Sequence, residues 1–292
     1  MKLSNKLTNF LKFDQGQMEV SLFPLHELDI AYYNQQKLDV YLPDTSSVKK
    51  PTIIVIHGGG WISGFKQSKF MQEMIKIVNA GINVVSIDYS LSTEARYPQQ
   101  IVDIKQSIKW VENNSDKYHF DLANVHLWGE SAGAHLSLLA GLIQNEKLLD
   151  IAIPQPTIKV KSIVAFYPAV NVTKIEEQLE TLGCVFTKDT NIYDEEGLIS
   201  LLVGKENFFK EEVLETLNPT SFIRADMPRM LLQHGTGDRL VPSQQSVDFY
   251  NEVKSKYPSQ EITLELFEGA IHTDDEFFTD KNIQRIVKFI KE

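Results

Sequence analysis

The sequence predicts an α/β protein in which a mostly parallel central sheet is flanked by helices. Short runs of β-branched and other apolar residues alternate with segments of helical periodicity, which is the pattern of strand–helix–strand units. Residues 171–218, a stretch of about fifty residues, interrupt this alternation and are too long for an ordinary connection. We therefore expect one domain over residues 1–292, with residues 171–218 inserted as a small helical cap.

The N-terminal residues 1–36 are expected to form an extension that packs on the body or on the cap. A short basic amphipathic helix is predicted between Lys2 and Phe13. Its apolar residues share one helical face: Leu3, Leu7, Phe10 and Leu11. Docking of this helix near the mouth of a site is favoured over a role at a membrane surface. Residues 37–42 then alternate in polarity, which predicts a half-buried antiparallel edge strand.

The remaining elements follow from periodicity alone. Buried strands are predicted at uninterrupted apolar runs, in residues 53–56, 84–87, 125–128, 163–166 and 230–232. Residues 262–266 alternate in polarity, so the last strand is expected near a sheet edge. Helices are predicted at residues 71–78, 101–111, 132–143 and 283–290.

Composition excludes several classes of function. The 292 residues include 29 Lys and Arg against 39 Asp and Glu, and this net charge of −10 disfavours nucleic acid and anionic membranes as partners. Cys184 is the only cysteine, so an intramolecular disulfide and a multi-cysteine metal site are excluded. We expect neither a metal nor a cofactor, because no ligand cluster or cofactor motif is visible. With no secretory signal or apolar span, we expect a cytoplasmic protein without a stable membrane anchor, and a homodimer stays open.

The segment Gly129-Glu130-Ser131-Ala132-Gly133 reads G-x-S-x-G between a predicted strand and a predicted helix. In such an elbow the serine occupies a sharp turn with an unfavourable backbone conformation, which lifts its hydroxyl clear of both elements. The two glycines provide the room that the close approach of strand and helix requires. Ser131 is therefore a candidate nucleophile.

A second motif, His57-Gly58-Gly59-Gly60-Trp61, follows the first buried strand. Consecutive glycines let backbone N–H groups approach a ligand oxygen closely. A plain turn is the alternative, whereas a phosphate loop is disfavoured because no G-K-[ST] follows. We expect the N–H groups of Gly59, Gly60 and Ala132 to bind an oxyanion, and Trp61 and Glu130 to contact substrate. Packing alone explains Trp61 equally well.

Asp238 and His272 each follow a predicted strand, at the sheet edge where ligand chemistry collects in open α/β sheets. A serine hydroxyl needs a base to take its proton as it attacks, and an imidazole can do this near neutral pH. Asp238 would orient that imidazole and stabilise its protonated form. Four other histidines are expected to make structural hydrogen bonds: His57, His126, His135 and His234. Asp274 and Asp275 are expected to be N-terminal charges of the last helix.

Together these motifs carry a family resemblance. With HGGGW at 57–61, GESAG at 129–133, GTGD at 235–238 and GAIH at 269–272, the sequence resembles the α/β-hydrolase carboxylesterases related to hormone-sensitive lipase and to bacterial acetyl and feruloyl esterases. The likeness extends from Leu38 onward. It implies an α/β-hydrolase fold and the triad Ser131, Asp238 and His272. The family's frequent Asp-Tyr-Arg-Leu is Asp88-Tyr89-Ser90-Leu91 here, which removes a cation but nothing catalytic.

The expected function is that of a serine carboxylesterase acting on a small ester through an acyl-enzyme. Acetyl to about butyryl groups are favoured, because the cap is rich in Glu and offers no continuous apolar tunnel for a long chain. An aromatic acyl group held by Trp61 with Phe208 or Phe209 is the alternative within esters. An amide hydrolase on the same triad is the runner-up, and a non-catalytic binding protein on this scaffold stays open.

Overall fold

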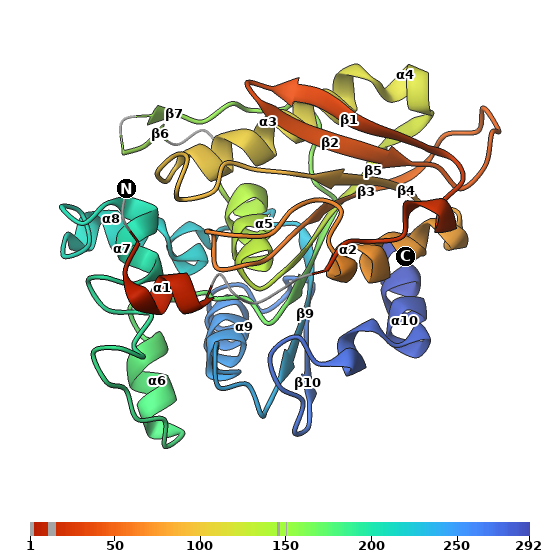
Figure 1. Ribbon diagram of the computed structural model, residues 1–292. Coiled ribbons are helices and arrows are strands. Elements are labelled where there is room, and N and C mark those ends of the chain that lie inside the picture. Colours follow the sequence, from red (N-terminus) through yellow and green to blue (C-terminus); the bar gives the residue numbers. More distant parts are fainter. Residues whose placement is uncertain (1–2, 11–15, 145–146, 150) are drawn as a thin grey trace.

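The computed structural model describes residues 3–10, 16–144, 147–149 and 151–292. Among these, an eight-stranded sheet runs through the molecule in the order β1-β2-β4-β3-β5-β8-β9-β10 (Figure 1). In this sheet the pairings β1–β2 and β2–β4 are antiparallel and the other five are parallel, so the predicted mostly parallel sheet is confirmed. The strands are β1 (His26–Tyr33), β2 (Gln36–Tyr41), β3 (Lys50–Ile56), β4 (Asn83–Ile87), β5 (Phe120–Glu130), β8 (Ser162–Phe166), β9 (Arg229–Gly235) and β10 (Ile262–Phe267).

The central strand β3 shows why the β-branched runs form this sheet. It pairs in parallel with β4 on one side and β5 on the other. Ile54 and Ile56 pack into the hydrophobic core on one face, and Ile53 and Val55 into the core on the opposite face. Successive side chains of a strand point to opposite faces, so a strand covered on both sides must be apolar at every position.

Helices cover both faces of the sheet (Figure 1). One face carries α3 (Gln99–Asn113), α5 (Ala132–Leu142) and α9 (Gln244–Lys256). The other carries α2 (Lys69–Ile75), the 3-10 helix at Lys76–Ala80 and α10 (Asp280–Lys291). Shorter elements lie in the connections: α4 (Ser115–Tyr118), β6 (Lys147–Leu148), β7 (Ile151–Ala152), and 3-10 helices at Val20–Leu22, Pro219–Phe222 and Asp275–Phe278.

Residues 171–218, the predicted cap, lie between β8 and β9 in the chain. They contain α6 (Ile175–Thr181), α7 (Leu198–Val203) and α8 (Glu211–Thr216). The N-terminal helix α1 (Asn5–Phe10) lies against the cap, far from its own sequence neighbours in the sheet (Figure 1). The Lys6 ammonium pairs with the Asp194 carboxylate, and the Ser4 hydroxyl donates to the backbone carbonyl of Glu196 over 3.1 Å.

Several predictions of local structure need correction. The described N-terminal helix begins at Asn5, later than predicted, and its proposed ends at residues 2 and 11–13 lie outside the described residues. Residues 26–33, assigned to the extension, form β1, which is the true sheet edge outside β2. Asp274 caps and Asp275 begins the 3-10 helix that precedes α10, whose own N-cap is Thr279. In the described part of the chain, no helix is long and apolar enough to cross a membrane.

Candidate active site

Ser131 lies at the sharp turn between β5 and α5. Its backbone has φ 51° and ψ −118°, a strained conformation for a residue with a side chain. The turn is close-packed, because a Cβ on Gly133 would overlap the carbonyl oxygen of Ile56, and one on Gly129 the carbonyl oxygen of Gly133. The two glycines therefore let strand and helix close around Ser131, as the G-x-S-x-G pattern predicts.

The structure brings together the three residues that the sequence proposes as a triad. His272 Nε2 lies 3.0 Å from Ser131 Oγ, and His272 Nδ1 lies 2.6 Å from Asp238 Oδ2. Each follows the carboxyl end of a parallel strand: β5 for Ser131, β9 for Asp238 and β10 for His272. The parallel sheet thus aligns residues that are 141 positions apart in the sequence, as for Ser131 and His272.

Asp238 is held as a buried carboxylate. Its Oδ1 accepts the backbone N–H groups of Leu240 and Val241, each at 2.8 Å, so both oxygens have donors. Burial raises the pKa of Asp238, but the nearby His272 and His234 outweigh it and hold that pKa well below its usual range. The acid is therefore ionised at neutral pH, in the state that a hydrogen bond from His272 Nδ1–H requires.

The glycine loop after β3 lies against the elbow. Gly59, Gly60 and Trp61 all have positive φ, so the chain turns sharply there. Gly60 and Ala132 line the cavity above Ser131 together, and Ala132 is the first residue of α5, where backbone N–H groups have no partner within the helix. Gly59 precedes Gly60 in the loop and does not line this cavity; its carbonyl oxygen closes the turn by accepting the N–H of Ser63 at 3.0 Å.

Glu130 does not occupy the substrate-facing position that we expected. Its carboxylate is buried and accepts the backbone N–H of Gly58, behind the glycine loop. It is not among the residues that line the cavity above Ser131. Burial raises the pKa of Glu130, while the charge of His272 and the Gly58 N–H act in the opposite direction. Glu130 thus fixes the base of the loop through its hydrogen bond to the Gly58 N–H.

Trp61 lines the cavity and also anchors the loop. Its indole N–H donates to His135 Nδ1 over 3.2 Å, and His135 Nε2 lies 2.7 Å from the carbonyl oxygen of Leu217. The carbonyl can only accept, so His135 carries its proton on Nε2. The glycine loop is thereby connected through α5 to the end of the cap.

The other predicted structural histidines also find partners. His57 Nδ1 lies 2.8 Å from the Gly58 carbonyl oxygen, and His126 Nδ1 lies 2.7 Å from Ser162 Oγ. His234 contacts Ser246 Oγ and the Val241 carbonyl oxygen, each at 2.8 Å. Among the described residues, no group of three or more His, Cys, Asp or Glu side chains could hold a metal ion.

The cavity above Ser131, which we call the Ser131 cavity, is small. Its volume is about 20 Å³, enough for a single water molecule. Besides the predicted Gly60, Trp61, Ser131 and Ala132, its walls come from residues that the motifs did not reveal: Phe10, Ala169, Ile175, Tyr193, Leu198, Leu240 and Val241. Only the predicted apolar face of the N-terminal helix gave any signal for Phe10. The others belong to the cap and to connecting segments without a motif.

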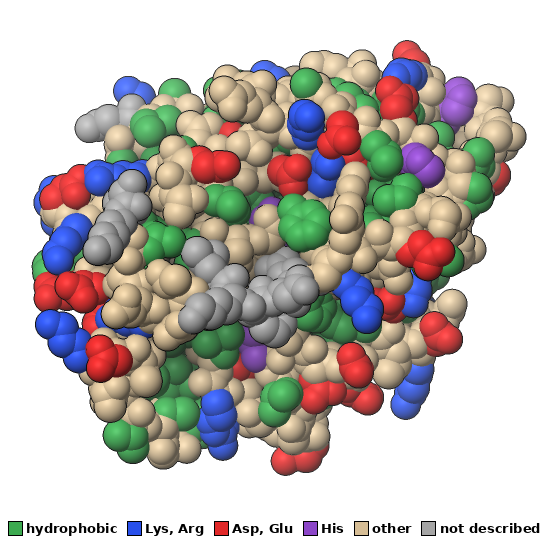
Figure 2. All heavy atoms as spheres, in the orientation of Figure 1, with side chains coloured by type: hydrophobic (Ala, Val, Ile, Leu, Met, Phe, Trp, Pro, Cys, Tyr) green, Lys and Arg blue, Asp and Glu red, His purple; other side chains and the backbone are tan. Residues whose placement is uncertain are grey.

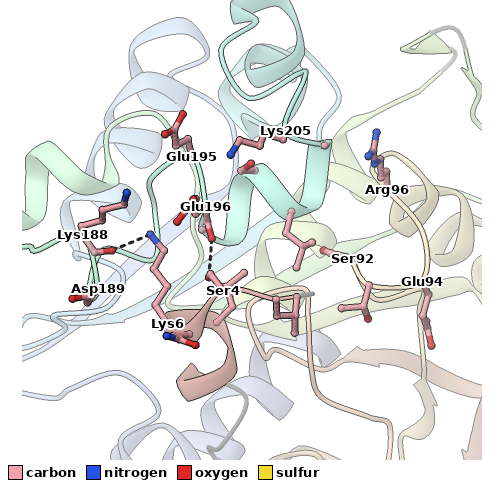
Figure 3. A pocket seen from close by; sticks show the side chains of 18 of the residues that line it. Ser4, Lys6, Ser92, Glu94, Arg96, Lys188, Asp189, Glu195, Glu196 and Lys205 are labelled. Carbon is pink, nitrogen blue, oxygen red and sulfur yellow. Dashed lines mark hydrogen bonds between the residues drawn. The ribbon is translucent and has the colours of Figure 1, made fainter. Parts of the chain in front are cut away.

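Phe208 and Phe209 were expected to join Trp61 in an aromatic subsite, but they line a different pocket in the cap. On the side of α1, a groove of about 720 Å³ is lined largely by polar and charged side chains, among them Lys6, Glu94 and Arg96 (Figure 3). We call it the α1 groove. Over the face shown in Figure 2, acidic and basic side chains are intermixed rather than gathered by sign.

The mostly parallel sheet, the strained serine elbow and the Ser131–His272–Asp238 arrangement at its carboxyl edge define an α/β-hydrolase, as the motifs predict. Within that class the chain belongs to the BD-FAE family, whose model matches residues 38–253.

Curated relatives include the probable carboxylic ester hydrolase LipM of Mycobacterium tuberculosis, which is 27% identical over 80% of this chain and 53% of its own length. The isoprenylcysteine alpha-carbonyl methylesterase ICME of Arabidopsis thaliana is 27% identical over 84% of this chain and 56% of its own. The chain thus spans about half the length of the curated relatives it matches.

Solved structures share the fold. A truncated carbohydrate esterase from gut microbiota superposes with a TM-score of 0.77 at 24% identity, covering 94% of this chain and 98% of that one. Esterase B from Lactobacillus rhamnosis gives a TM-score of 0.71 at 20% identity, covering 91% of this chain and 84% of the other.

Proposed function

We propose that this protein is a serine carboxylesterase that hydrolyses small esters through an acyl-enzyme formed on Ser131. The observation that carries the proposal is the continuous contact from Ser131 Oγ through His272 to the buried Asp238, with Ser131 facing a cavity that Gly60 and Ala132 also line. Nucleophile, base and orienting acid are within hydrogen-bond reach of one another, which is the geometric requirement for nucleophilic acyl transfer.

The first half of the reaction acylates Ser131. Its Oγ attacks the ester carbonyl carbon while His272 Nε2 takes the hydroxyl proton, and Asp238 stabilises the resulting imidazolium. The carbonyl oxygen becomes an oxyanion, which the N–H groups of Gly60 and Ala132, with Gly59, would bind at the positive end of α5. Collapse of this intermediate breaks the bond to the alcohol oxygen, and His272 returns the proton to the departing alcohol.

The second half repeats these steps with water. His272 takes a proton from a water molecule as that water attacks the acyl carbonyl carbon, and the oxyanion occupies the same site. Collapse then breaks the bond to Ser131 Oγ, which regains its proton from His272, and the carboxylic acid leaves. The residues thus account for both half-reactions without a co-reactant other than water.

One observation favours esters over amides as substrates, and another favours short acyl groups. Relatives named for ester hydrolysis support esters over amides, and the names LipM, LipQ and ICME all denote ester-cleaving proteins. The Ser131 cavity has room for about one water molecule, so its walls must yield even for an acetyl group. A long chain would require far more displacement, which supports acetyl to about butyryl groups.

The proposal is tested by comparing kcat/KM for p-nitrophenyl esters from C2 to C16, methyl ferulate, and p-nitroanilides matched to the short esters. We expect the highest value at C2 to C4, and a loss of several orders of magnitude in Ser131→Ala without loss of the fold. A higher kcat/KM on an anilide would favour an amide hydrolase instead. Near-parental turnover in Ser131→Ala would contradict the mechanism.

A further inference from the structure

The cap contains an apolar pocket that the mechanism does not use. We call it the cap pocket. Its volume is about 300 Å³, at the lower end of the range for small-molecule sites. Apolar side chains supply most of its walls: Val172, Ile199, Phe208, Phe209 and Leu214. Glu176 at its margin is already engaged, because its carboxylate accepts the side-chain amide of Asn191 over 2.6 Å.

The cap pocket and the Ser131 cavity share a wall, and Tyr193 is the residue that lines both. Neighbouring residues of the cap also divide between the two spaces. Ile175 lines the Ser131 cavity while the next residue, Glu176, lines the cap pocket, and Leu198 and Ile199 are divided in the same way. At Tyr193 a single side chain therefore separates the Ser131 cavity from an apolar space about fifteen times larger.

Tyr193 is held in this wall from the side of the triad. Its side chain is buried, and its hydroxyl donates a hydrogen bond to the carbonyl oxygen of Leu240. Leu240 itself donates its N–H to Asp238 and lines the Ser131 cavity. The ring is thus fixed by the loop that also fixes the catalytic acid, which keeps the partition closed.

We infer that Tyr193 sets the acyl-chain length of this enzyme by closing off the cap pocket, which is a latent binding site for an apolar acyl chain of medium length. The inference rests on the proposed esterase function. With Tyr193 in place, the acyl group is confined to the small Ser131 cavity. Shortening this side chain joins the two spaces. The distal methylenes of a longer acyl chain then move out of water and into the cap pocket.

A second residue of the Ser131 cavity, outside the cap, offers a matched comparison. Phe10 of α1 also lines the Ser131 cavity, and its ring would lie 2.9 Å from a Cβ placed on Gly60. Other residues of α1 line the α1 groove, whose labelled side chains include Lys188 and Glu196 (Figure 3). Removing the Phe10 ring therefore enlarges the cavity toward polar surroundings, where an acyl chain gains little from leaving water.

The test measures kcat/KM for p-nitrophenyl esters from C2 to C12 in the parent protein, Tyr193→Ala, Tyr193→Phe and Phe10→Ala. In Tyr193→Ala each methylene that enters the cap pocket should raise kcat/KM about fourfold, the equivalent of about 0.8 kcal/mol per methylene. We expect the optimum to move to C6–C10 and the C8 to C4 ratio to rise at least tenfold. Tyr193→Phe keeps the ring, so its chain-length profile should match that of the parent.

A second substitution in the open background tests where the chain goes. Ile199→Phe adds bulk to the cap pocket, so in Tyr193→Ala it should return the optimum to C4 or shorter. Tyr193→Leu, which keeps an apolar side chain, gives a milder opening if Tyr193→Ala fails to fold. An unchanged C8 to C4 ratio in folded Tyr193→Ala or Tyr193→Leu would overturn the inference, as would an equal shift in Phe10→Ala. Failure of the proposed function looks different, because the parent protein would then hydrolyse none of the esters.

Discussion

Acidification is expected to destabilise this protein because two histidines are buried in their neutral form. His135 lies between the indole N–H of Trp61 and the carbonyl oxygen of Leu217, so a second proton on Nδ1 would face a donor. Burial lowers the pKa of His135 to about 4. Burial, with Lys161 and Arg229 nearby, lowers the pKa of His126 to about 3.

The direction and size of the effect follow from proton linkage. In the unfolded chain these imidazoles take up protons near pH 6.5, whereas in the native protein they stay neutral until the pH falls much lower. Between these limits the unfolded state binds more protons, so the stabilisation present above pH 6.5 is lost as the pH falls. At pH 4.5 each histidine costs about 2.5 kcal/mol of unfolding free energy. Two such losses are a large part of the ~5–15 kcal/mol that is typical of the free energy of unfolding of a native protein.

Urea unfolding at pH 7 and pH 4.5 measures this loss, with His135→Gln as the matched variant. A Gln amide can accept from Trp61 and donate to the Leu217 carbonyl but does not titrate. On acidification, the free energy of unfolding of His135→Gln should therefore fall by about 2.5 kcal/mol less than that of the parent. His135→Leu leaves both partners buried and unpaired and should cost about 1–3 kcal/mol for each at pH 7. An equal pH dependence in the parent and His135→Gln would refute this reasoning.

Three further substitutions probe the site. Asp238→Asn should lower kcat/KM on p-nitrophenyl acetate by about 10⁴ with the fold retained, because an amide no longer selects the imidazole tautomer that the reaction needs; a loss below tenfold would contradict its role. Gly58→Ala should lower kcat by about 10² or more, because the added Cβ would overlap the buried Glu130 carboxylate and displace the glycine loop; a parental kcat would show that the loop adapts. Asp194→Asn removes the charged partner of the buried Lys6 ammonium, which keeps only neutral acceptors such as the Lys188 carbonyl, so trypsin should cleave after Lys6 at least about tenfold faster; parental resistance would show that the ion pair does not hold α1.

Prediction from sequence succeeded where a local pattern determined the outcome. The β-branched run at 53–56 must be covered on both faces, and the G-x-S-x-G spacing requires a strand-to-helix elbow. It failed at β1, whose half-exposed, irregular pairing with β2 contains register shifts and weakens the alternation. It also missed α9, whose buried positions include the polar Gln245 and Ser246.

The walls of the site could not be predicted because tertiary packing assembles them. Tyr193 and Leu198 of the cap meet Phe10 of α1 only when the cap and α1 pack over the sheet. From the sequence, the Glu-rich cap was expected to be mainly polar and to offer no continuous apolar tunnel. In the structure, Phe208 and Phe209 line a pocket in it. The identity of Glu130 was visible in the motif, whereas the direction of its side chain behind the glycine loop was not.

The central claim is that Ser131 is a nucleophile activated by His272, and reaction with a fluorophosphonate tests it most directly. Mass spectrometry of the intact protein and of its peptides should show a single adduct, located on Ser131. His272→Ala should react more slowly by several orders of magnitude while keeping its fold. An adduct on another residue, no adduct at all, or a parental labelling rate in His272→Ala would contradict the account.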